Sequence, residues 1–301
     1  MVNDQYVVSL QVLDLASGDI SPVFNTPVNA WIDYFSVSPN SQQLVISYVL
    51  PGPDGSPAYP ALYTMPLDGS TPPQLLFNPP GKNDAYIQAE WSPDGKYIYY
   101  THVDEGSWAA SQINPAYEIL RMVYPNGRPE LIARNAYWPR LSSDGSRLVY
   151  VLVDPFLARN KLRVANPDGS DVRKVTLTGI ALPNIIDAPL FSPDGRSILF
   201  SAAPQGLSHK PGWLQTVLGI QNVKADGIIP SDWWSVPITG GKPMQITDIQ
   251  SIGLFASVSP DRKHIAVSSG AGLAIMNPDG SDLTQLLPNA EIISSTVSWI
   301  P

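Results

Sequence analysis

Histidine and cysteine, which often carry acid–base, nucleophilic or metal chemistry, are scarce in this chain, and its histidines lie far apart in the sequence. The 301 residues include three histidines, His102, His209 and His264, and no cysteine. The lack of cysteine excludes disulfides, thiolate metal sites and cysteine nucleophiles. The chain also lacks the Gly-x-Ser-x-Gly, His-Glu-x-x-His and Gly-rich phosphate-loop motifs of serine hydrolases, zinc proteases and nucleotide-binding proteins. We therefore expect no cofactor, no metal site and no locally encoded catalytic centre.

Aromatic side chains form the second group of candidate functional residues. Aromatic anchors dominate the energetics of many interfaces, so one interpretation is a binding surface for a peptide or a glycan. The alternative interpretation is that these side chains pack between sheets and anchor the long connections against them. Trp213 is the strongest candidate, because it begins an apolar stretch in a long connection. The aromatic residues that we consider for binding are Trp31, Tyr34, Tyr86, Trp108, Trp138, Trp213 and Trp233.

A short turn motif recurs along the whole chain and indicates how these residues are positioned. Residues 91–95 read Trp-Ser-Pro-Asp-Gly, and residues 191–195 read Phe-Ser-Pro-Asp-Gly. Pro and Gly favour a tight turn, and Asp bonds its own backbone two residues further on. A run of β-forming residues such as 97–100 follows each turn, which indicates strand, turn, strand. The copies of this motif lie near residues 38, 92, 142, 192, 259 and 299.

A second motif lies between the copies of the first and predicts a second hairpin in each repeat. Asp-Gly-Ser occurs at residues 68–70, 168–170 and 279–281, with looser versions in the other repeats. Two hairpins make four antiparallel strands, and such sheets bury both faces when they stack radially. The sequence therefore predicts an all-β fold in one domain, residues 1–301, built as a six-bladed β-propeller of four-stranded antiparallel blades. Residues 6–24 and 292–299 are expected to pair in one blade, so that the N- and C-terminal strands close the ring.

The Ser-Pro-Asp-Gly turn paired with a later Asp-Gly-Ser turn resembles the TolB-like six-bladed β-propeller family over essentially the whole chain. The chain departs from the pattern at Asn40, Ser143 and Arg262. That family includes periplasmic and extracytoplasmic proteins that serve as interaction scaffolds, and related propellers precede hydrolase domains in prolyl oligopeptidase-like enzymes. The resemblance implies a periplasmic or extracellular binding protein whose export signal is not in this chain, although a cytoplasmic location stays open.

The long connections are expected to share one face of the propeller. Strand direction alternates, so connections between strands two and three and from blade to blade fall opposite the short Asp-Gly turns. The long insertions 51–60, 103–115 and 203–232 are all of these types. Loops on a rigid scaffold often carry recognition. We therefore expect this loop-rich face to bind the partner.

Two charged residues occupy equivalent positions in consecutive repeats. Glu90 and Arg140 each lie two residues before the motif serine, so they could pair near the propeller axis. Such a pair is either an ion pair between blades or a charge couple that anchors a ligand. An enzymatic alternative is a channel-centred, metal-dependent hydrolase or lyase. Its active site would combine Glu90 with Asp33, Asp187 and Asn184.

The net charge and the composition of the chain exclude some classes of binding partner. The net charge is −8 and the isoelectric point is near 4.8, which argues against binding to nucleic acid. No stretch of about 18 uninterrupted apolar residues is present, so we expect no membrane insertion. The leading interpretation is a non-catalytic, monomeric binding or scaffold propeller that recognises a protein segment or a carbohydrate.

Overall fold

The computed structural model describes residues 7–52, 58–79, 81, 84–104, 116–154, 159–179, 186–203, 230–288 and 296–300. The chain divides into two compact units, which are Met1–Pro139 with Ile300–Pro301 (unit 1) and Arg140–Trp299 (unit 2). Every regular element in the described ranges is a β-strand. None of the described residues belongs to a helix long and apolar enough to span a membrane.

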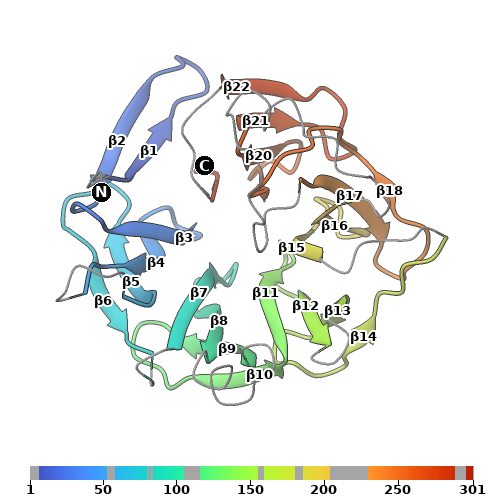
Figure 1. Cartoon of the computed structure of the whole chain (residues 1–301), viewed down its shortest axis with the longest axis horizontal. Coiled ribbons are helices and arrows are strands. Elements are labelled where there is room, and N and C mark those ends of the chain that lie inside the picture. Colours follow the sequence, from blue (N-terminus) through green and yellow to red (C-terminus); the bar gives the residue numbers. More distant parts are fainter. Residues whose placement is uncertain are drawn as a thin grey trace, which may run out of the picture. The chain divides into compact units, whose positions relative to one another are not determined.

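Unit 1 contains a two-stranded sheet followed by two four-stranded sheets, and we call each four-stranded sheet a blade (Figure 1). The two-stranded sheet consists of β1 (Ser9–Leu13) and β2 (Ile20–Asn25). Blade I consists of β3 (Trp31–Val37), β4 (Gln43–Val49), β5 (Ala61–Pro66) and β6 (Gln74–Phe77). Blade II consists of β7 (Asp84–Trp91), β8 (Tyr97–Asp104), β9 (Ala116–Val123) and β10 (Glu130–Arg134).

The remaining three blades follow in sequence order. Blade III consists of β11 (Ala136–Leu141), β12 (Leu148–Asp154), β13 (Arg159–Ala165) and β14 (Arg173–Lys174). Blade IV consists of β15 (Ile186–Phe191), β16 (Ser197–Ala202), β17 (Asp232–Pro237) and β18 (Met244–Gln245). Blade V consists of β19 (Phe255–Val258), β20 (Ile265–Ser269), β21 (Gly272–Met276) and β22 (Thr284–Pro288). Strands consecutive in sequence are neighbours in each blade, as the two-hairpin repeat predicts.

The prediction of six four-stranded blades is wrong by one blade. The described residues contain five four-stranded blades and the two-stranded sheet β1–β2. The described residues before β3 form a single hairpin, which supplies only two strands. The segment 296–300 is not a strand, and residues 289–295 lie outside the described ranges. Pairing of the N- and C-terminal strands is therefore not confirmed. The Trp299 indole donates instead to the Ser257 carbonyl of β19, at 2.8 Å.

The first turn motif forms the same hydrogen-bond network in all five blades. In blade III the Ser142 hydroxyl donates to Asp144 at 2.6 Å and accepts from the Arg147 backbone N–H at 3.0 Å. The Asp144 carboxylate also accepts from the Ser146 backbone N–H. The hydrogen bond from Ser142, followed by those from Ser146, lowers the pKa of Asp144 to about 2. Equivalent contacts begin at Ser38, Ser92, Ser192 and Ser259, where Asn40 replaces the aspartate in the first.

Glycines of the β5–β6, β17–β18 and β21–β22 turns pack against the outermost strand of the sheet before them. A Cβ at Gly69 would lie 2.2 Å from the Val23 carbonyl oxygen in β2. One at Gly280 would lie 1.9 Å from the carbonyl oxygen of Ile246, which follows β18. Gly240 approaches the carbonyl of Thr176, just after β14, in the same way. The turn glycine therefore allows close packing between sheets.

The two-stranded sheet packs on blade I through an apolar core. Leu10 in β1 belongs to one cluster with Ile32, Leu44, Ile46 and Met65 of blade I, and Val23 and Phe24 of β2 pack against it. Blade II adds a second cluster that includes Trp91, Ile98 and Tyr100.

Candidate functional site

An apolar pocket of about 420 Å³ lies in unit 1. Two of its tyrosines, Tyr48 and Tyr63, pack edge to face. Their ring centroids are 5.3 Å apart and the ring planes form an angle of 89°. Phe24 extends this contact, with its ring centroid 6.2 Å from that of Tyr48. None of the lining residues is charged. They come from β2 and the residues after it, from β4 and the residue after it, from β5, and from the β5–β6 connection: Phe24, Asn25, Thr26, Pro27, Tyr48, Leu50, Tyr63, Pro72 and Pro73.

Local hydrogen bonds and burial determine the chemistry of this pocket. The Thr26 hydroxyl donates to the Ala30 carbonyl at 2.9 Å and accepts from the Val8 backbone N–H at 3.0 Å, which positions the chain after β2. Burial raises the pKa of Tyr48 to about 12 and also raises that of Tyr63, so both phenols stay neutral at pH 7. The pocket therefore offers aromatic and proline surface with neutral hydroxyl groups.

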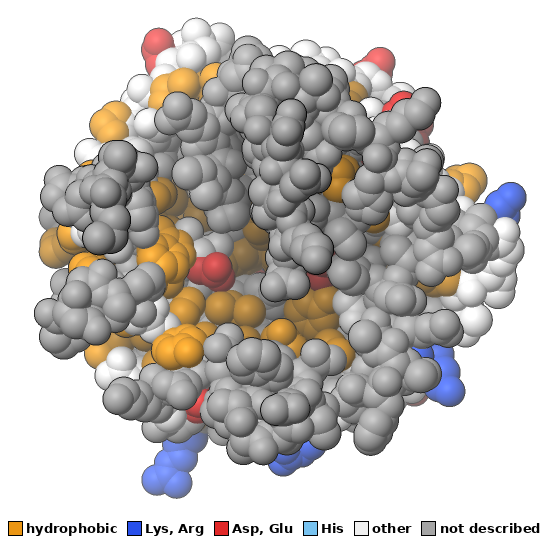
Figure 2. All heavy atoms as spheres, in the orientation of Figure 1, with side chains coloured by type: hydrophobic (Ala, Val, Ile, Leu, Met, Phe, Trp, Pro, Cys, Tyr) orange, Lys and Arg blue, Asp and Glu red, His pale blue; other side chains and the backbone are white. Residues whose placement is uncertain are grey.

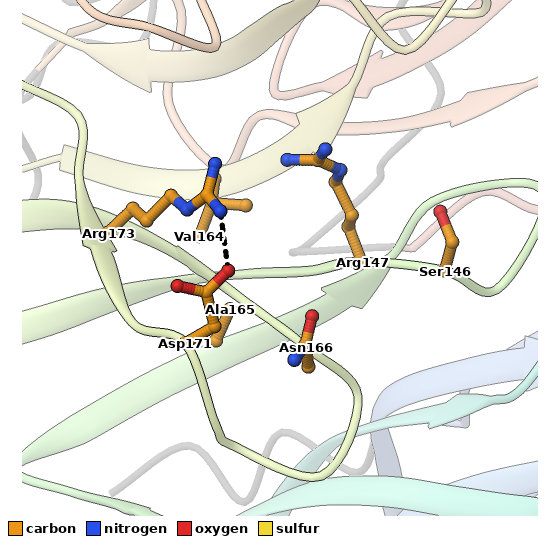
Figure 3. A pocket seen from close by; sticks show the side chains of 7 residues that line it. All are labelled: Ser146, Arg147, Val164, Ala165, Asn166, Asp171 and Arg173. Carbon is orange, nitrogen blue, oxygen red and sulfur yellow. Dashed lines mark hydrogen bonds and ion pairs between the residues drawn. The ribbon is translucent and has the colours of Figure 1, made fainter.

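A smaller, polar pocket of about 180 Å³ lies in blade III (Figure 3). Figure 3 shows the Arg147 and Arg173 side chains extending toward one another across it. Arg173 is already engaged, because its guanidinium donates to Asp171 at 2.6 Å, and its side chain is 64% exposed. Exposed ion pairs of this kind contribute little to binding or stability. This pocket is a solvent-open depression lined by Ser146, Arg147, Val164, Ala165, Asn166, Asp171 and Arg173.

Four of the predicted aromatic residues are buried. Tyr34, Tyr86, Trp138 and Trp233 are between 0% and 8% exposed, and Trp31 is half-buried. Tyr34 packs edge to face on Trp138, with ring centroids 5.7 Å apart. This contact agrees with the alternative interpretation, in which the aromatic side chains pack between sheets. Their role in binding stays a prediction. Trp108 and Trp213 lie outside the described residues.

Sequence reasoning missed Gln88 of β7, which bonds to Trp138 in β11; both residues belong to unit 1. Its side-chain oxygen accepts from the Thr101 hydroxyl at 2.8 Å and from the Trp138 backbone N–H at 2.9 Å. Gln88 lies at a β-bulge in β7 and has a φ of 57°; Trp138 and Ala188, at 50-residue intervals, also have positive φ. That spacing is the one sequence signal that could have drawn attention to these positions.

The predicted charged residues Glu90 and Arg140 are half-buried. Burial raises the pKa of Glu90 in β7 to about 8 and lowers the pKa of Arg140 in β11 to about 9. Glu90 belongs to unit 1 and Arg140 to unit 2, and their pairing stays a prediction. Asp187 is half-buried in β15, and Asn184 lies outside the described residues. No group of three or more His, Asp and Glu side chains in the described ranges is arranged to hold a metal ion. The metal-dependent alternative stays untested.

His102 lies in a charged network at one end of blade II. Its Nε2 is 3.0 Å from the Asp84 carboxylate, and its Nδ1 is 3.7 Å from Glu118. Arg134 bonds Glu118 from β10, so the network joins all four strands of the blade. His209, which falls in the insertion 203–232 of the predicted loop-rich face, lies outside the described residues.

Asp33 provides a test of how burial affects stability. It is the unpaired bulge residue of β3, and burial raises its pKa from 3.8 to about 6. An acid whose pKa is raised by folding destabilises the folded state once the unfolded chain ionises. The free energy of unfolding should therefore fall as pH rises from about 4 to about 6. We expect Asp33→Asn to be more stable by about 2 kcal/mol at pH 7 and to lose this pH dependence.

Urea denaturation between pH 4 and pH 8 measures this effect. Asp19→Asn, which replaces an exposed aspartate in the β1–β2 turn, is the matched control and should follow the parent protein. Equal pH dependence in the Asp33→Asn variant and its parent would show that folding does not raise the pKa of Asp33.

Comparisons with known proteins show the fold. No protein-family model matches the chain, and neither does any curated protein. Among solved structures it is similar to a putative TolB from Agrobacterium tumefaciens, with 17% identity, a TM-score of 0.68, and 98% of this chain and 95% of that one covered. It is also similar to TolB from Acinetobacter baumannii, with 18% identity, a TM-score of 0.59, and 92% and 60% covered. The tricorn protease matches at 13% identity and a TM-score of 0.55, with 93% and 28% covered. These similarities show a β-propeller fold of four-stranded antiparallel blades.

Proposed function

We propose that this chain is a non-catalytic propeller that binds a protein segment. The apolar pocket between β2 and blade I supports this proposal most directly, because concave aromatic surface with a few polar groups is typical of binding sites. Aromatic-lined grooves also recognise extended and proline-containing peptides. Leu50, which lines the pocket, directly precedes the insertion 51–60 that the sequence assigned to the loop-rich face.

The surface composition agrees with a binding function. Figure 2 shows that hydrophobic side chains make up much of the described surface on the side drawn, whereas Lys and Arg are few. The resemblance to TolB-like propellers supports a protein ligand, and also an extracytoplasmic location, which fractionation of the source cells would test. Carbohydrate binding and the monomeric state stay predictions.

Selection of peptides on the immobilised protein tests the proposal. We expect the enriched peptides to share an apolar or aromatic anchor, and Tyr63→Ala to weaken their binding about tenfold or more. Pro72→Ser removes an exposed lining residue and should weaken binding without affecting the core. Leu131→Ala, at an exposed apolar position of β10, is the matched control and should bind normally. The proposal is wrong if no peptide is enriched, or if the selected peptides bind both pocket variants as tightly as the parent.

A further inference from the structure

The sheet β1–β2 corresponds to the third and fourth strands of a blade. The pairing of β1 with β2 shifts register after Leu10, the second residue of β1. The same shift follows Leu62 and Leu273, the second residues of β5 and β21, which are third strands of blades I and V. In addition, Gly69 packs on β2 as Gly240 and Gly280 pack beside β14 and β18, which are fourth strands. Two independent features therefore place β1 as a third strand.

One edge of β1 has no strand partner among the described residues. In the complete blades the third strand pairs with a second strand on one edge and with a fourth strand on the other, whereas β1 pairs with β2 alone. The Asp14 N–H donates to the Asp19 carbonyl across the hairpin, at 2.9 Å. Because successive residues of a strand point their backbone groups to opposite edges, Gln11 and Leu13 present theirs away from β2. We call this the β1 edge.

The strand β1 itself lacks the residue types that usually prevent pairing along an edge. Natural edge strands carry Pro, charged residues or a cover that blocks a further strand. The outer strand β2 has Pro22, which is opposite Gln11 and has no N–H to donate. By contrast, β1 reads Ser-Leu-Gln-Val-Leu, with no Pro, Gly or charged residue. The sequence therefore protects the outer strand of this sheet and leaves β1 able to accept a strand.

The surroundings of the β1 edge indicate what kind of strand it accepts. Val7, Leu15 and Ile20 are 54%, 51% and 45% exposed, so apolar surface flanks the hairpin. Asp14 and Asp19 add negative charge at its turn, and backbone hydrogen bonds from Ser17 and Ala16 lower the pKa of Asp14. The sequence contains no Lys or Arg before Lys82, so nothing in this part of the chain neutralises that charge. Complementary charge favours a basic ligand.

We propose that the β1 edge binds an extended segment of a partner protein in which apolar residues alternate with Lys or Arg. The backbone groups of Gln11 and Leu13 pair with the segment, as in other cases of strand addition. One set of its alternating side chains contacts the exposed apolar surface, and the basic set lies near the carboxylates of the β1–β2 turn. This site uses residues outside the apolar pocket and does not depend on binding there.

A designed peptide tests the site directly. The probe is an eight-residue peptide that alternates Lys with Val or Leu, added to the full chain. We expect it to slow hydrogen exchange of the Gln11 and Leu13 amides about tenfold, and we expect added salt to weaken binding. Two control peptides, one with Glu in place of Lys and one N-methylated on every second residue, should bind about tenfold more weakly. The N-methylated peptide keeps the side chains but lacks the N–H groups that pair with β1.

Protein variants test whether the peptide binds at the β1 edge. Gln11→Pro removes a donor that β2 does not use, so it should keep the melting temperature and lose peptide binding, whereas Asp19→Asn should weaken binding. If the Gln11 and Leu13 amides are already protected without peptide, the edge is filled by this chain or by a second copy, and the proposal is wrong. It is also wrong if the three peptides bind equally. The Gln11→Pro variant is also tested with a peptide selected on the apolar pocket. If it binds that peptide, the proposed function holds whether or not the β1 edge binds a strand, so the two failures can be told apart.

Discussion

Replacing Trp233 by alanine should lower the free energy of unfolding by about 4 kcal/mol, a large part of the stability of an average domain. Trp233 lies in β17 of blade IV, is 0% exposed, and is among the largest fully buried side chains in the described ranges. Its removal would leave a cavity that the β16–β17–β18 sheet cannot close without breaking backbone pairs. Urea denaturation followed by tryptophan fluorescence measures the loss.

Phenylalanine variants of the two adjacent tryptophans test how the hydrogen bonding of each indole contributes to stability. The Trp233 indole N–H is buried and has no hydrogen-bond partner among the described residues, so Trp233→Phe removes an unsatisfied donor. The neighbouring Trp234 indole donates to the Ala202 carbonyl at 3.1 Å, so Trp234→Phe loses that hydrogen bond. We expect Trp233→Phe to cost less stability than Trp234→Phe. The reverse order would mean that the Trp233 N–H is satisfied in solution.

The second large effect is expected at Gly69. Gly69 and Gly195 both have a φ of 68°, so alanine is strained by about 1 kcal/mol at either position. At Gly195 a Cβ would meet nothing within 4 Å, but at Gly69 it would lie 2.2 Å from the Val23 carbonyl oxygen. Gly69→Ala should therefore cost about 3 kcal/mol, because blade I must move away from β2.

Comparing the two alanine variants by urea denaturation isolates the contact between sheets. Backbone strain is common to both, so the difference between their free energies of unfolding reports the clash with Val23. Similar losses in Gly69→Ala and Gly195→Ala would show that β2 does not pack on this turn in solution. The assignment of β2 as a fourth strand would then lose one of its two supports.

The turns were predictable because their hydrogen bonds are local. Ser142, Asp144 and the Arg147 backbone form one network within six consecutive residues. In the other blades a serine and an aspartate, or Asn40 in blade I, form it in the same way. The antiparallel order of the strands follows from these turns, since a tight turn joins strands that are neighbours in sequence. The chain ends show the limit of this reasoning, because the motif at residue 299 suggested a strand where residues 296–300 form none.

The order of hairpins, their turn types and the four-stranded blade were determined by the sequence alone, because each depends on contacts between residues a few positions apart. The tertiary structure decided the rest. It placed the Gln88 side chain on the Trp138 backbone fifty residues away, desolvated Glu90 and Asp33, and left β1 with a single strand partner in the described ranges. Desolvation and packing depend on which distant segments the fold brings together, and no short stretch of sequence records that information.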